Sequence, residues 1–227
     1  MKKSALSPFR GFFSPGLYFP TGHAMRLYNF TSTPPSADPF FQIWLAMPEG
    51  KQILYVDPES AATVVAQWYR FDETVGADIA WAWHTSNELE IEMKAHNGTT
   101  LDLTLQLGSS AATALLNTMV RLAPRWMLYA GPMLAVSSLS FNVLLGLGGV
   151  HIAGETETGK PYVTEADELA VVRQASATLN DKDLGDFAQP PRPISFGPSR
   201  VANRPVVARG TARLAYEAPP AGLGTPS

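Results

Sequence analysis

Hydrophobic and polar residues alternate along much of the chain with the period of two that is typical of β-strands. The clearest case is the segment 88–107. Every second residue from Leu89 to Met93 and from Leu101 to Leu107 is hydrophobic, and the residues between them are charged or polar. This alternation predicts two strands that each bury one face and expose the other.

The turn between these two strands can be deduced from their faces. A two-residue loop would place Ile91 opposite Thr104, so apolar side chains would face polar ones. A three-residue loop at 96–98 places Ile91 opposite Leu103 instead, which puts all the apolar side chains on one face. Such a loop requires a left-handed backbone at Gly98, which a glycine adopts without steric cost.

Shorter runs of β-branched, aromatic and aliphatic residues predict further strands. Two of them, separated by a four-residue loop with a glycine, predict a hairpin at 41–57. The first forty residues carry many aromatic side chains among prolines and glycines, and we expect an irregular arm there that ends in a strand. The remaining predicted strands are 25–31, 77–83, 170–179 and 206–217.

Helical periodicity replaces the alternation in two places. In 58–69 apolar residues recur every three or four positions, Pro58 suits the first helical position, and Asp57 can cap it. In 109–122 one of two serines, Ser109 or Ser110, can cap a second helix. Its polar residues recur every fourth position from Thr113 to Arg121 and form a stripe.

The segment from Trp126 to Gly154 contains no Asp, Glu, Lys or Arg. Three interpretations stay open: a buried helix, a shallow membrane contact through 126–147, or a membrane span, which needs about 20 apolar residues. Glycine and proline interrupt the segment near both ends, so its continuous core, 132–145, is shorter than a span requires. We therefore expect a helical excursion over 109–147 that packs against the rest of the protein.

Two later segments have weaker patterns. Residues 165–179 fit either a helix or a strand, and we favour a strand over 170–179. Residues 186–205 are rich in proline and predict a surface connector, with a polyproline recognition segment as the alternative. Residues 218–227 predict a disordered tail.

These elements predict one mainly β domain over residues 1–217. It is an antiparallel β-barrel or a pair of packed sheets, with a short helix near 58–69 and the helical excursion near 109–147.

Composition excludes several functions. The chain has no cysteine, so thiol catalysis, disulfides and zinc–thiolate sites are excluded. Its net charge is -3 and its Lys and Arg residues are scattered, a pattern that does not indicate nucleic-acid binding. Charged residues make up only 16% of the chain and hydrophobic ones 45%. We expect a soluble cytoplasmic protein with an apolar cavity or an apolar contact surface.

The stretch GETETGKPY, residues 154–162, contains the glycine and lysine spacing of a phosphate-binding loop. Such a loop needs a helix after its lysine and a hydroxyl residue next to it, but here Pro161 follows Lys160. Glu155 and Glu157 would also repel a triphosphate. The stretch predicts a hairpin turn, and no bound nucleotide is expected.

Four carboxylates fall on the polar face of the hairpin: Glu88, Glu90, Glu92 and Asp102. The deduced register places Glu92 opposite Asp102, a like-charge pair that costs stability. Either the face is solvated, or it lines a cavity where one carboxylate has a raised pKa and acts as an acid or base.

The four histidines show no metal-binding spacing, so neither a metal nor a cofactor is expected. His84 and His151 are the candidates for catalysis, each together with a hairpin carboxylate.

Three functions remain open. The first is the binding of a small apolar molecule inside the barrel, near Trp81, Trp83 and Phe141. The second is a lyase, isomerase or hydrolase that needs no metal or nucleotide and uses His84 or His151 with Glu90, Glu92 or Asp102. The third is a peripheral membrane or protein-interaction module that uses residues 126–147.

Overall fold

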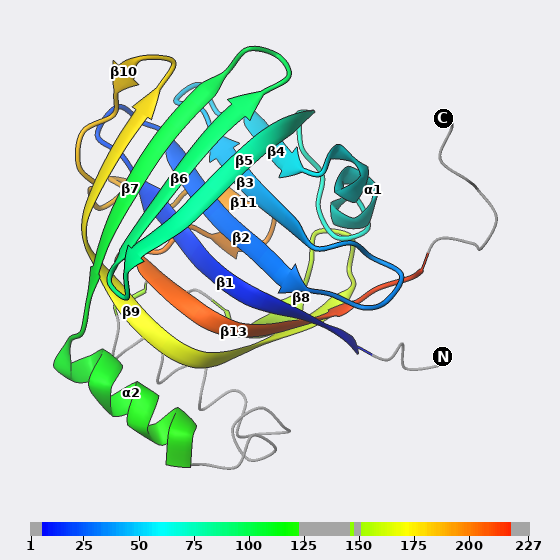
Figure 1. The fold of residues 1–227 in the computed structure, drawn as a ribbon, viewed down its shortest axis with the longest axis vertical. Coiled ribbons are helices and arrows are strands. Elements are labelled where there is room, and N and C mark those ends of the chain that lie inside the picture. The colour runs from blue at the N-terminus through cyan, green and yellow to red at the C-terminus, as the bar shows by residue number, and fades with distance from the viewer. Residues whose placement is uncertain (1–5, 123–145, 148–150, 219–227) are drawn as a thin grey trace.

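The computed structural model describes residues 6–122, 146–147 and 151–218, and its strands form a closed barrel (Figure 1). The main sheet has eleven strands, of which β8 and β10 pair only with β9, so nine described strands form the ring. The ring closes because the first half of β9 pairs with β13 and its second half with β7. These nine strands are β1 (Leu6–Tyr18), β2 (Ala24–Ser32), β3 (Phe40–Ala46), β4 (Gln52–Asp57), β5 (Glu73–Thr85), β6 (Glu88–Ala95), β7 (Thr100–Gly108), β9 (Pro161–Leu179) and β13 (Val206–Ala215).

The paired strands of the ring are antiparallel except β4 and β5, which run parallel and are joined by a helical turn. A separate small sheet, β11–β12, lies outside the ring. The predicted mainly β barrel with accompanying helices is thus confirmed. The smaller elements are η1 (Glu59–Ala61), α1 (Ala62–Val65), α2 (Ala111–Leu122), β8 (Ala153–Glu155), β10 (Lys182–Asp183), β11 (Ser195–Phe196) and β12 (Ser199–Arg200).

Side chains from all nine ring strands pack together inside the barrel. Leu89, Ile91 and Met93 of β6 lie in this cluster, as do the four leucines of β7 between 101 and 107. Successive side chains point to opposite faces of a strand, so the carboxylates between them point out of the barrel.

The register of the β6–β7 hairpin is the predicted one. Ile91 pairs with Leu103 and Glu92 with Asp102. The backbone amide of Ala95 donates to the carbonyl of Thr99, which leaves three residues in the loop. Gly98 has a φ of 88°, as the three-residue loop requires.

The prediction of an irregular N-terminal arm was wrong, because residues 6–18 form the 13-residue strand β1. Both faces of β1 are buried: Phe12 and Leu17 pack inside the barrel, and Phe9 packs on its outer side. A strand buried on both faces shows no alternation. Register shifts at 10–11 and 14–17 accommodate glycine and proline without ending the strand.

The helix predicted at 58–69 begins where expected but is short. Only Glu59–Ala61 and Ala62–Val65 are helical. Asp57 does not cap it; its carboxylate accepts a hydrogen bond of 3.0 Å from the amide of Ile79 on β5. Residues 66–69 turn back toward the barrel and bury Trp68.

The segment 170–179 is a strand, as we favoured, and the strand also includes 165–169, because both belong to the 19-residue β9. The stretch 154–162 is a hairpin turn: β8 and β9 pair across it, Gly159 has a φ of 78°, and strand rather than helix follows Lys160.

Helix α2 begins as predicted, with the Ser110 hydroxyl accepting a hydrogen bond from the Thr113 amide. Two residues of its polar stripe face the barrel. Thr113 is buried, and the Asn117 side chain donates one hydrogen bond to the backbone carbonyl of Leu169 on β9 and accepts another from the backbone amide of the same residue. The rest of the predicted excursion, except 146–147, lies outside the described residues. So does Phe141, and so does the predicted tail apart from Ala218.

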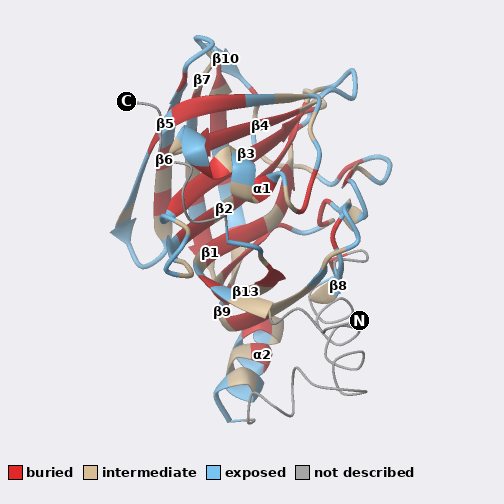
Figure 2. Ribbon diagram, turned by 90° about the vertical axis from the view of Figure 1, so that its right-hand side faces the viewer, coloured by how far each residue is buried: buried red, intermediate tan, exposed pale blue. Residues whose placement is uncertain are grey.

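A second layer covers one outer side of the barrel (Figure 2). It consists of the helical turn after β4, the β8–β9 hairpin and the segment 186–205. The prediction of a surface connector at 186–205 was wrong for its second half, because Phe196, Val201 and Ala202 are buried. This layer explains why β1, β2 and β3 carry hydrophobic residues on both faces.

Candidate functional site

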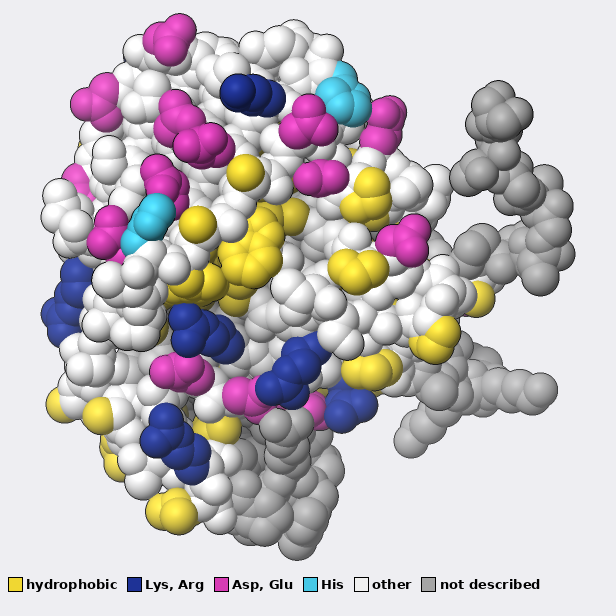
Figure 3. Space-filling model, in the orientation of Figure 1, with side chains coloured by type: hydrophobic (Ala, Val, Ile, Leu, Met, Phe, Trp, Pro, Cys, Tyr) yellow, Lys and Arg dark blue, Asp and Glu magenta, His cyan; other side chains and the backbone are white. Residues whose placement is uncertain are grey.

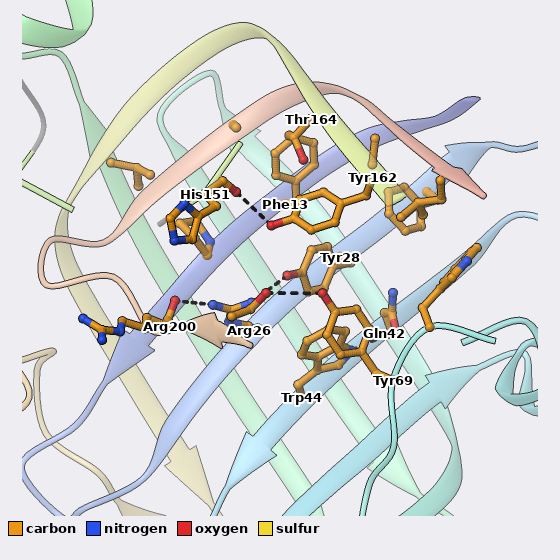
Figure 4. Close-up of a pocket in the computed structure, with 18 of the residues that line it drawn as sticks. Phe13, Arg26, Tyr28, Gln42, Trp44, Tyr69, His151, Tyr162, Thr164 and Arg200 are labelled. Carbon is orange, nitrogen blue, oxygen red and sulfur yellow. Dashed lines mark hydrogen bonds between the residues drawn. The ribbon is translucent and has the colours of Figure 1, made fainter. Parts of the chain in front are cut away.

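A pocket of about 130 Å³ lies between the outer face of the barrel and the covering layer. Its floor comes from β13, β1, β2 and β3. Its walls come from residues near α1, from the β8–β9 hairpin and from β12 (Figure 4). Much of the interior of the barrel, where we expected a ligand, is filled with hydrophobic side chains.

Arg26 lies at the centre of the pocket (Figure 4). On β2 its neighbours Met25 and Leu27 point into the barrel, so Arg26 points outward, under the covering layer. Its side chain is only 3% exposed. One guanidinium nitrogen donates to the Tyr28 hydroxyl at 3.2 Å, and the other donates to the backbone carbonyl of Arg200.

Several aromatic rings line the pocket, including those of Trp44, Tyr28 and Tyr69, and Phe196 packs next to them. The ring centroid of Trp44 lies 4.5 Å from that of Tyr69, 4.8 Å from that of Tyr28 and 5.6 Å from that of Phe196. The indole nitrogen of Trp44 donates to the side-chain oxygen of Gln42 at 2.9 Å, which fixes the orientation of the ring. These contacts surround the Trp44 ring on several sides.

Two further tyrosine hydroxyls line the pocket. That of Tyr69 lies 3.2 Å from the Ser199 hydroxyl, and that of Tyr162 donates to the backbone carbonyl of His151 at 3.2 Å. Burial raises the pKa of both tyrosines above the ordinary value. Both phenols therefore stay protonated at physiological pH and can donate hydrogen bonds.

A second, more open hollow of about 280 Å³ lies where β1, β5 and β13 approach one another. Trp81 and Trp83, which we predicted to bind a ligand, line this hollow and lie away from Arg26. The guanidinium of Arg209 lies 4.1 Å from the centroid of the Trp83 ring and also forms an ion pair with Glu168. The positive charge here thus already has a partner.

The predicted catalytic residues do not meet in one site. His151 precedes β8, is exposed, and lines the pocket around Arg26. Glu92 and Asp102 are exposed on the outer face of β6 and β7, where acidic side chains gather in Figure 3. His84 on β5 and Glu90 on β6 are joined by a hydrogen bond on the same face.

We expect the imidazole of His84 to titrate above pH 6.5, because the hydrogen bond and charge of Glu90 raise its pKa. The pair's contribution to stability is present below pH 6.5 and is lost as the pH rises through the raised pKa. An NMR titration of the His84 ring protons measures this, and Glu90→Gln should lower the midpoint toward 6.5. Glu92→Gln is the control, and an equal shift in both variants would contradict the pairing.

Sequence reasoning did not single out Arg26, Tyr28, Tyr69 or Ser199. One signal was present: β2 is hydrophobic on both faces, so a charged residue in its middle must lie under a covering layer. Tyr28 lies two positions from Arg26 on the same strand. Tyr69 and Ser199 come from segments more than forty positions away, and no spacing rule connects them to Arg26.

Within the described residues, no group of three or more histidine, aspartate or glutamate side chains could hold a metal ion. None of the described helices is both long and apolar enough to cross a membrane. No protein-family model matches the chain, and no curated protein is significantly similar to it.

Proposed function

We propose that the protein binds a small, mainly apolar molecule in the pocket around Arg26. The observation that supports this is a partly open pocket lined by aromatic and aliphatic side chains, with a few buried polar groups among them. Binding sites for small molecules commonly combine these features. An engineered cavity of about 150 Å³ holds benzene, and this pocket of about 130 Å³ is similar in size and partly open, so a molecule built on one ring has the right size for it.

Filling the pocket should weaken binding. Ala208 on β13 is buried and lines the pocket, so Ala208→Leu places added carbon atoms in the space that a ligand would occupy. We expect at least one of three single-ring probes, benzyl alcohol, benzoate and benzylamine, to bind the protein in isothermal titration calorimetry. Its affinity should fall about tenfold or more in the variant.

The matched control is Ala82→Leu, at an exposed position of β5, which should leave the affinity unchanged. Thermal unfolding of both variants checks that they are folded. If no probe binds the unmodified protein, or if Ala208→Leu binds as well as Ala82→Leu, the proposal is wrong.

A further inference from the structure

Arg26 is buried without a negatively charged partner among the described residues. Two of its nitrogens donate to a neutral hydroxyl and a backbone carbonyl, and its Nε has no hydrogen-bond partner. The ion pairs found in the described part of the chain involve other basic residues. A guanidinium stays protonated in proteins, so a positive charge is held inside the pocket.

Neutral groups compensate this charge only in part. The centroids of the Trp44 and Phe196 rings each lie 5.7 Å from the guanidinium carbon, a distance at which cation–π attraction acts. Taking a charge out of water remains costly unless a charge of opposite sign and hydrogen bonds replace the water. Such a site gains most from an anion placed next to the guanidinium.

The other polar groups at the pocket also favour an anion. Of the described residues that line it, the ionisable basic ones are Arg26, Arg200 and His151, and none is Asp or Glu. The Tyr28 hydroxyl accepts from Arg26, so that bond leaves its own proton able to donate. The Tyr69 hydroxyl, whose hydrogen bond with Ser199 can run in either direction, can also donate at the same pocket. A carboxylate accepts two parallel hydrogen bonds from a guanidinium, which a neutral hydroxyl cannot do.

We infer that the ligand is a small carboxylic acid, with its carboxylate on Arg26 and a ring-sized apolar body against Trp44 and Tyr69. This inference rests on the proposed function and adds the charge of the ligand to it. A volume of about 130 Å³ suits a single-ring acid such as benzoate.

The test compares three probes of similar size and different charge. Isothermal titration calorimetry should show benzoate binding at least about tenfold more tightly than benzyl alcohol, with benzylamine weakest, because charge-assisted hydrogen bonds are the stronger ones. Arg26→Met, which keeps the length of the side chain and removes its charge, should remove the preference for benzoate and leave the affinity for benzyl alcohol nearly unchanged.

Arg209→Met is the matched control, because Arg209 also lies over a tryptophan ring but outside this pocket, and it should keep the preference. If benzoate and benzyl alcohol bind equally well to the unmodified protein, the inference is overturned while the proposed function stands. If none of the three binds, the proposed function itself fails. The comparison on the unmodified protein decides the question even where Arg26→Met does not fold.

Discussion

Trp68→Ala should destabilise the protein by about 3–5 kcal/mol, the range typical of removing a large buried aromatic side chain. Trp68 is 2% exposed, and its ring packs edge-on against Phe9 with 5.2 Å between the centroids. Its indole nitrogen donates to the carbonyl of Ala215 at 2.7 Å, and the substitution leaves this buried carbonyl without its partner.

The same substitution should also weaken ligand binding, because Trp68 joins the covering layer to the barrel. Its backbone carbonyl accepts a hydrogen bond of 3.2 Å from Thr158 in the β8–β9 turn, and its side chain lines the pocket. Without the indole ring, the segment after α1 loses its main attachment to β1 and β13.

Urea denaturation followed by circular dichroism measures the change in unfolding free energy. Trp81→Ala is the matched control: Trp81 is 39% exposed, so its removal takes less apolar area out of the protein and should cost less than the removal of Trp68. An equal cost for the two substitutions would show that Trp68 does not anchor the covering layer.

The sequence was most informative where a strand has one buried and one exposed face. The β6–β7 hairpin could be predicted to the residue, because a shift of one position would exchange Ile91 and Glu92 between core and solvent. Strand β1 offered no such contrast. Both of its faces are buried, and Pro15 lies at a register shift, so local rules indicated an irregular segment.

The candidate site could not be predicted because it depends on how the covering layer lies on the barrel. Arg26, Tyr69, Tyr162 and Ser199 come from four separate parts of the chain. Short motifs and periodicity describe neighbours in sequence, whereas these residues meet only after the ring closes and 186–205 folds over it. His84 and Glu90, six positions apart on adjacent strands, are the kind of pair that such rules can find.

Gly11→Ala should destabilise the protein by about 3 kcal/mol or more, because there is no room for a side chain between β1 and β2. A Cβ atom at Gly11 would lie 1.8 Å from the carbonyl oxygen of Asn29 and 3.1 Å from the Cα of Phe30. Both contacts are with backbone, so a change of rotamer cannot relieve them and the two strands must separate.

Separation of β1 from β2 should also reduce affinity for the pocket ligand, since Phe13 on β1 and Arg26 on β2 both line the pocket. Thermal unfolding and titration with benzoate measure the two effects on the same protein. Gly154→Ala on β8 is the control, because its Cβ would meet only side-chain atoms of Tyr162 at ordinary contact distances, from 3.6 Å. If both variants are equally stable, β1 and β2 do not approach as closely at Gly11 as described. A stability loss without any loss of affinity would mean that the pocket does not depend on the spacing of these two strands.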